Sequence, residues 1–124
     1  GNIMKIAIPV INKDLNSNID ASFGRTNYFL FYNTETKESV FVENTAKDST
    51  GGAGIKAAQT IVDNGADTII ATRLGQNAAY VLQNAKIKIY KAINGSVNDN
   101  IDALEKDKLD TLDNFHKGFH GRGK

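Results

Sequence analysis

The sequence contains no cysteine, and this absence excludes several kinds of chemistry. Without thiols the chain can form no disulfide, hold no metal through thiolates, bind no conventional iron–sulfur cluster through cysteine and use no cysteine nucleophile. Net charge is also nearly absent, since 15 Lys and Arg stand against 14 Asp and Glu. This balance gives no electrostatic reason to expect nucleic acid or a membrane surface as a partner.

A long apolar run is missing as well. No segment approaches the roughly 18 apolar residues that a membrane span needs, and no basic start followed by an apolar stretch predicts a signal peptide. We therefore expect a cytoplasmic protein. The 124 residues can bury one core but not two of ordinary size. We expect one domain over residues 1–112 and a flexible, glycine-, histidine- and Lys/Arg-rich tail over residues 113–124.

Apolar periodicity predicts an α/β fold. Residues 3–11 are almost continuously apolar, as in a strand covered on both faces, although Pro9 predicts that the strand ends near this residue or contains a bulge there. Aromatic and β-branched runs at 28–32 and 39–43, joined by a polar turn, indicate a hairpin. The rest alternates between helices and strands, with helices from Ile55 to Asn64, over 75–84 and after Gly95, and strands at 67–72 and 87–92. Such crossovers make the strands parallel and place helices on the sheet faces.

Gly51, Gly52 and Gly54 directly precede the first predicted helix. Free backbone amides and the positive end of the helix dipole favour an anion at such a position. The run matches neither the phosphate loop nor the dinucleotide fingerprint. The same glycines can instead serve only to permit a tight loop with positive φ.

A second segment of this kind, with Thr72, Gly75 and Asn77, leads from a predicted strand end into the next helix. Ligands of open α/β sheets bind at the carboxyl ends of the parallel strands, so the two helix starts are expected to converge there. Alternatively, Gly75 is a plain turn residue and Arg73 a solvated surface charge.

Phe23, Gly24 and Arg25 end a long polar loop before the hairpin. The guanidinium of Arg25 offers a planar fork of donors for carboxylate or phosphate groups. The alternative is an arginine that is solvated or paired with a nearby acid, for which Asp20 is the candidate.

His116 and His120 are the only histidines, and their spacing would place both on one face of a helix, as a two-ligand metal site requires. The surrounding glycines argue against a helix, so the alternative is a solvated tail or an expression artefact. Histidines in a loose tail also argue against catalysis by imidazole. The predicted central strands lack the interior carboxylates that a magnesium-dependent nuclease needs.

Taken in order, these segments resemble the nitrogenase iron-molybdenum cofactor biosynthesis family, which includes NifX-type carriers and the C-terminal domain of NifB-type proteins. The resemblance rests on Met-Lys-Ile-Ala-Ile-Pro-Val at 4–10, Phe-Gly-Arg-Thr at 23–26, Gly-Gly-Ala-Gly at 51–54, and Gly75 followed by Asn77-Ala78. It implies a three-layer α/β/α domain with a ribonuclease H-like motif. The implied sheet has five strands and is mixed, with strand two antiparallel to the others.

The resemblance also implies a binding or carrier protein without enzymatic activity. The expected cargo is an anionic iron–sulfur or iron-molybdenum-type cluster or its precursor, held without a covalent bond and exchanged with cofactor-assembly proteins. Many members carry histidine before Phe-Gly-Arg, where this chain has Ser22, and some carry cysteines or a histidine-rich tail. Binding would then depend on backbone amides and Arg25. The expected site comprises Ser22, Phe23, Gly24, Arg25, Gly51, Gly52, Gly54, Thr72, Gly75 and Asn77.

Two other functions remain open at this point. The same edge of the sheet suits a regulatory or interaction module that binds a small anionic metabolite or a protein partner. A ribonuclease H-like nuclease is disfavoured because the metal-binding carboxylates are missing.

Overall fold

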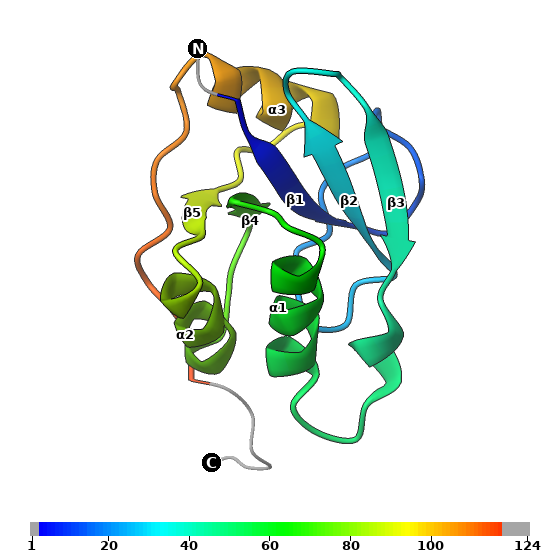
Figure 1. Cartoon of the computed structure of the whole chain (residues 1–124), viewed down its shortest axis with the longest axis vertical. Helices are drawn as coiled ribbons and strands as arrows, with labels where there is room; N and C mark the ends of the chain where they lie inside the picture. The colour runs from blue at the N-terminus through cyan, green and yellow to red at the C-terminus, as the bar shows by residue number, and fades with distance from the viewer. Residues whose placement is uncertain (1–2, 118–124) are drawn as a thin grey trace.

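A five-stranded mixed sheet forms the middle layer of the fold in the computed structural model, which describes residues 3–117 (Figure 1). The strands lie in the order β3-β2-β1-β4-β5. Their bounds are Lys5–Val10 for β1, Tyr28–Asn33 for β2, Ser39–Glu43 for β3, Thr68–Ala71 for β4 and Lys88–Lys91 for β5. β2 is antiparallel to β1 and β3, whereas β1, β4 and β5 are parallel. This order and this single reversed strand confirm the predicted ribonuclease H-like sheet.

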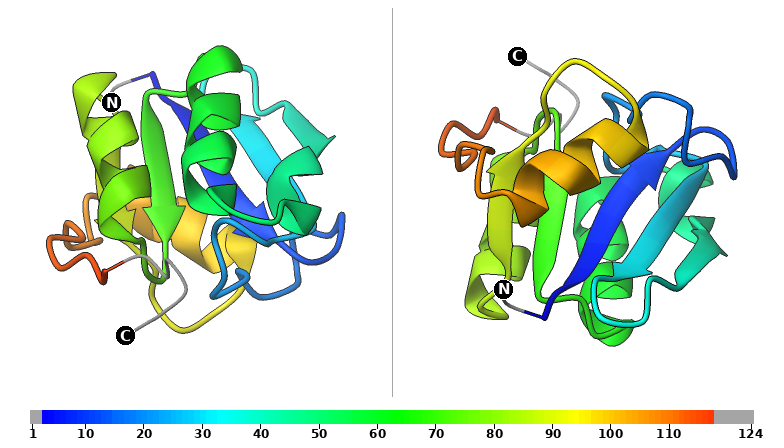
Figure 2. Two further views of the ribbon diagram at one scale, coloured as in Figure 1. Left: turned by 90° about the horizontal axis from the view of Figure 1, so that it is seen from below. Right: turned by 90° about the horizontal axis from the view of Figure 1, so that it is seen from above.

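Helices cover both faces of the sheet, as Figure 2 shows from two sides. α1 (Ala53–Asp63) and α2 (Gln76–Asn84) lie side by side on one face, and α3 (Val97–Glu105) crosses the other. Strand β1 is buried on both faces because Ala7 packs in the α1/α2 core while Ile6 and Ile8 pack in the α3 core. The three layers are therefore confirmed. Within residues 3–117 no helix is long and apolar enough to cross a membrane.

Strand β1 ends at Val10, one residue after Pro9, so the expected strand end near Pro9 is confirmed, and no bulge forms there. On one side Pro9 stands opposite Phe29 of β2 in regular register. On the other side the pairing with β4 already stops at Ala7, and the Pro9 carbonyl accepts a hydrogen bond from the Asp20 amide (2.9 Å). Since no residue of β4 pairs with Pro9, its missing N–H costs no ladder bond.

The two central parallel strands diverge beyond that point. From β1 the chain continues through the loop of residues 11–27 to β2, whereas from β4 it continues through residues 72–75 to α2 on the other side. A divergence of this kind leaves a crevice outside the carboxyl ends of the strands, where open α/β sheets bind their ligands.

The C-terminal segment returns along the outer edge of β5 (Figure 1). The Lys91 amide donates to the Asp110 carbonyl (2.8 Å), and the Leu112 amide donates to the Ile89 carbonyl (3.0 Å). Farther on, the His116 amide donates to the Leu74 carbonyl (3.1 Å). This differs from the expected flexible tail over 113–124, because the part of it that the structure describes is tied down through its backbone. Residues 118–124, with His120, lie outside the described residues.

Leu112 gives a test of this anchoring, since its side chain is only 8% exposed and joins the α1/α2 core. Leu112→Ala is expected to lower the free energy of unfolding by about 2–4 kcal/mol, because truncation of a buried leucine removes apolar contacts and leaves a cavity. Chemical denaturation measures the change. The control is Ile93→Ala, at a side chain that is 43% exposed, for which a change within roughly 0.5 kcal/mol is expected. Equal effects for both variants would contradict the packed segment.

Candidate functional site

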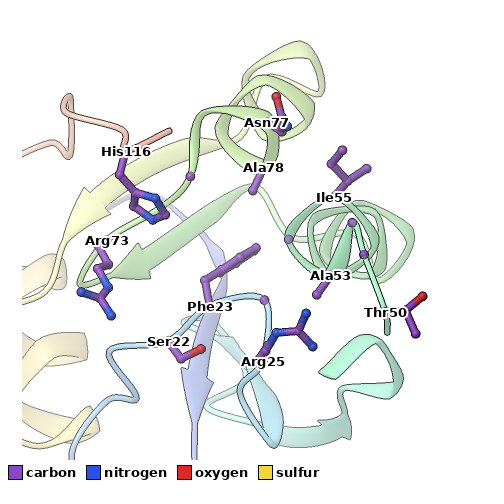
Figure 3. Close-up of a pocket in the computed structure, with 15 residues that line it drawn as sticks. Ser22, Phe23, Arg25, Thr50, Ala53, Ile55, Arg73, Asn77, Ala78 and His116 are labelled. Carbon is purple, nitrogen blue, oxygen red and sulfur yellow. The ribbon is translucent and has the colours of Figure 1, made fainter. Parts of the chain in front are cut away.

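A pocket of about 420 Å³ opens in the crevice where β1 and β4 diverge (Figure 3). The loop before β2 borders it with residues 22–25 and the start of α1 with residues 50–55. The turn into α2 contributes Arg73, Gly75, Asn77 and Ala78. His116 of the C-terminal segment completes the lining. The volume lies within the range of ordinary small-ligand pockets.

The structure brings the predicted site residues together with one exception. The lining includes Ser22, Phe23, Gly24, Arg25, Gly51, Gly52, Gly54, Gly75 and Asn77. Thr72 does not line the pocket, because β4 ends at Ala71 and it is Arg73, one residue further along the turn, that borders the cavity. Arg73, for which the sequence analysis gave a solvated charge as the alternative, lies at the position along the turn where Thr72 was expected to border the site. Whether a ligand binds at these residues stays a prediction.

The first turn of α1 faces the pocket without a side-chain cap. Its N-cap is Gly52, whose φ of +69° lies in the left-handed region that favours glycine. The Lys56 amide donates to the Gly52 carbonyl (3.0 Å), so the amides of residues 53–55 precede the first hydrogen bond within the helix. These three amides are the donors that α1 offers at the pocket.

The start of α2 is also uncapped by side chains. Its N-cap is Gly75, and the Gln76 amide donates to the His116 carbonyl (2.8 Å). By contrast, α3 starts with a complete capping box, in which Ser96 and Asp99 satisfy each other's amides. The two helices that begin at the pocket thus have no side-chain cap, although the His116 carbonyl accepts from the first amide of α2, whereas the helix on the opposite face is fully capped.

Arg25 lies at the pocket rim and clamps the neighbouring segment. Its Nη1 group donates to the carbonyls of Lys47 (2.6 Å) and Ser49 (3.0 Å), which belong to or follow the 3₁₀ helix η1 (Thr45–Asp48). The suggested pairing with Asp20 was wrong, because that carboxylate instead accepts from the Ser22 amide (2.9 Å). The Nε and Nη2 donors of Arg25 have no partner among residues 3–117, so they remain available at the rim.

Gly24 packs directly against the first turn of α1. A Cβ atom at this position would stand 2.8 Å from the Gly54 nitrogen and 3.0 Å from its Cα, closer than real side chains approach backbone. Beneath it, the buried ring of Phe23 stacks at a tilt on Phe29, with the ring centroids 5.2 Å apart. In the Phe-Gly-Arg segment, Phe23 therefore lines the pocket, Gly24 contacts the backbone of α1, and Arg25 binds the carbonyls of Lys47 and Ser49.

Asn44 is a positioning residue that the sequence analysis missed. Its side chain is 1% exposed, and Nδ2 donates to the carbonyls of Gly24 and Thr26 (both 2.9 Å), while Oδ1 accepts from the Ala46 amide (3.2 Å). One amide group thus ties the loop before β2 to η1. The sequence shows only a polar residue after a strand, which looks the same as an asparagine in a surface turn.

The electrostatics of the pocket favour negative charge. Its lining contains two cationic side chains, Arg25 and Arg73, and, among the described residues, no aspartate or glutamate. Arg73 forms no ion pair or side-chain hydrogen bond with any residue in the range 3–117. The chain as a whole is nearly neutral, so this attraction is local.

The expected two-histidine metal site takes a different form. His116 lies in extended chain beside Gly75 rather than in a helix, and His120 is outside the described residues. Across the described part of the chain, no group of three His, Cys, Asp or Glu side chains could hold a metal ion. The pocket therefore offers donors for an anion and one imidazole, not a cage for a bare cation.

Comparisons with known proteins identify the class. A sequence model described as dinitrogenase iron-molybdenum cofactor matches residues 4–107, and the chain belongs to this family. An uncharacterized protein of Methanocaldococcus jannaschii is 32% identical over 114 residues, covering 90% of this chain and 93% of the relative.

Solved structures share the fold. A Thermotoga protein provisionally assigned as NifB superposes with a TM-score of 0.79 and 37% identity, covering 92% of this chain and 97% of that one. The apo form of the orange protein from Desulfovibrio gigas superposes with a TM-score of 0.84 and 24% identity, covering 90% and 95%. The second likeness concerns the fold alone.

Gly24→Ala tests the close contact between the loop and α1. We expect the added methyl group to push the two backbones apart and lower the free energy of unfolding by about 1–3 kcal/mol. The matched control is Gly51→Ala, since a Cβ at Gly51 meets nothing within 4 Å. Thermal and chemical unfolding of both variants give the comparison, and a tolerated Gly24→Ala would contradict the contact.

Asn44→Asp keeps the shape of the side chain but removes both N–H donors. We expect a loss of about 2–4 kcal/mol of stability at neutral pH, because a buried carboxylate would face two carbonyl oxygens. Asn94→Asp, at an exposed position, makes the same chemical change and is expected to stay within roughly 0.5 kcal/mol. Denaturation of the two variants in parallel measures the difference. Equal stability would contradict a structural role for the hydrogen bonds from Asn44 to the loop.

Proposed function

We propose that this protein is a non-catalytic binding or carrier protein for an anionic metallocluster of the iron–sulfur or iron-molybdenum type, or its precursor. The observation that carries the proposal is the meeting of two uncapped helix starts and two arginines at one pocket whose described lining contains no acid. Oriented amides and guanidinium donors hold an anion without any change in the protein's own charge state.

The donor set fits a cluster that arrives already assembled. Such a cluster brings its own sulfide ligands and a net negative charge, and it presents acceptors to the amides of residues 53–55 and to Arg25. The chain has no cysteine, and residues 3–117 contain no three-ligand group, so building a cluster from free ions is not supported. The family membership and the Thermotoga relative's assignment as NifB point to the same cargo.

A carrier needs no catalytic group, and the pocket is consistent with that. Its described lining holds no carboxylate and no thiol. Association with the cargo would be reversible and non-covalent. Partners would be the cofactor-assembly proteins that deliver and receive the cluster, with nitrogen fixation and a cytoplasmic location as the matching expectations.

A second function shares the same pocket. The size of the pocket and its backbone amide donors, which can bind any anion, also suit a small anionic metabolite. Ile55 borders the cavity and is 43% exposed, so a protein partner could contact the rim. Amide shift mapping with a panel of phosphorylated metabolites separates this alternative, because shifts at residues 51–55 and 73–78 without cluster binding would favour it.

The direct test is anaerobic titration with isolated iron-molybdenum cofactor, followed by gel filtration. Co-elution of metal with the protein, together with amide shifts at the helix starts, is the expected result. Absence of both would remove the carrier function.

Arg73→Gln should weaken this binding roughly tenfold, because it removes one charged donor of the pocket. Stability should hardly change, since Arg73 is exposed and makes no described side-chain contact. Lys88→Gln removes the same charge from the exposed surface of β5 and should leave affinity unaltered. The same titration compares the variants, and an equal loss for both would mean that only net charge matters.

A further inference from the structure

The backbone of His116 is fixed on both sides of Gly75. Its amide donates to the Leu74 carbonyl (3.1 Å), and its carbonyl accepts from the Gln76 amide (2.8 Å), which makes a parallel bridge between His116 and Gly75. A residue held by two such bonds has its Cα–Cβ direction set by the pairing. The C-terminal segment therefore delivers this side chain to a defined place.

The imidazole ring lies against the start of α2 and borders the pocket. A Cβ atom at Gly75 would stand 3.4 Å from the ring's Cε1 atom, which is van der Waals contact. Figure 3 shows the ring on the Arg73 side of the pocket, directed toward the region of Phe23.

One ring nitrogen is already committed to the backbone. Nδ1 lies 3.1 Å from the Lys117 carbonyl oxygen, and a carbonyl can only accept, so Nδ1 carries the proton. In the neutral ring the lone pair is then on Nε2, which has no hydrogen-bond partner among residues 3–117. Histidines that bind metals have this arrangement, with the other ring N–H donated to a carbonyl or carboxylate.

We infer that His116 Nε2 is the ligand through which the pocket coordinates a metal atom of its anionic cargo. The inference rests on the proposed function and deepens it. The cargo would be a metal complex that carries its own anionic ligands and has one exchangeable coordination position. The amides of α1 and α2 and the two arginines would meet the anionic shell, while His116 meets the metal.

The chemistry is a ligand substitution. The Nε2–metal bond forms with the lone pair of the neutral ring, and a weakly held solvent molecule leaves the metal. No proton or electron is transferred. A bare cation would find only this one imidazole, since residues 3–117 contain no three-ligand group. Coordination thus distinguishes a metal complex from a plain oxyanion such as phosphate, which can bind to the amides and arginines but offers no metal atom to His116.

The test compares the full-length protein with His116→Asn and His116→Gln, using two probes. With isolated iron-molybdenum cofactor under anaerobic conditions, both variants should bind roughly tenfold more weakly than the wild type. With inorganic phosphate, the wild type and both variants should give the same affinity. Unfolding midpoints of the variants confirm that the fold is kept, and the use of two substitutions guards against one that disturbs it.

Nitrogen-15 NMR of the ring gives a readout independent of affinity. The free protein should show the Nδ1–H tautomer. Adding the cofactor should shift or broaden the Nε2 resonance, whereas adding phosphate should leave it unchanged. If the wild type fails to bind the cofactor, both the proposed function and the coordination by His116 are overturned. If the wild type binds while both variants bind equally well and Nε2 is unperturbed, only the coordination by His116 is overturned.

Discussion

The pocket depends on a contact that leaves no room for a side chain, that of the Gly24 backbone with the first turn of α1 at Gly54. Asn44 holds the Gly24 carbonyl from below, and Arg25 binds the carbonyls of Lys47 and Ser49 from the rim. These bonds join the loop before β2, η1 and the start of α1 into one unit. Because its parts fix one another, the free amides of α1 are aimed at the cavity before any ligand arrives, which lowers the ordering cost of binding.

The attraction for anions comes from the partial charges of backbone amides and from the full charges of two arginines, although the chain as a whole has little net charge. Two helix starts contribute oriented N–H groups, and exposed arginines add cationic donors at opposite sides of the cavity. Short-range interactions of this kind act within the pocket, and salt screens the exposed part of them over about 10 Å. A carrier benefits from such a site, because cargo is held by many modest interactions and can be released without a chemical step.

Sequence patterns were enough for the sheet, the three helices and most of the pocket lining, because apolar periodicity marks each element and glycines before two helices mark the carboxyl edge of the sheet. They failed where the outcome depends on tertiary backbone pairing. His116 looked mobile because its anchoring uses main-chain groups of Leu74 and Gln76, which leave no trace in residue type. Arg73 and Thr72 are neighbours, and only the geometry of the turn decides which one borders the cavity.

The course of residues 110–112 along β5 also has a consequence for self-association. An open sheet normally presents unpaired N–H and C=O groups along both of its margins, and these recruit other chains. Here one margin is occupied by the molecule's own returning segment, so strand addition by a foreign chain is obstructed there. The other margin is β3, where Val40 is 53% exposed and β3 pairs only with β2 within the described residues. Any sheet-to-sheet oligomer of this protein would therefore grow from β3, at the side of the molecule remote from His116.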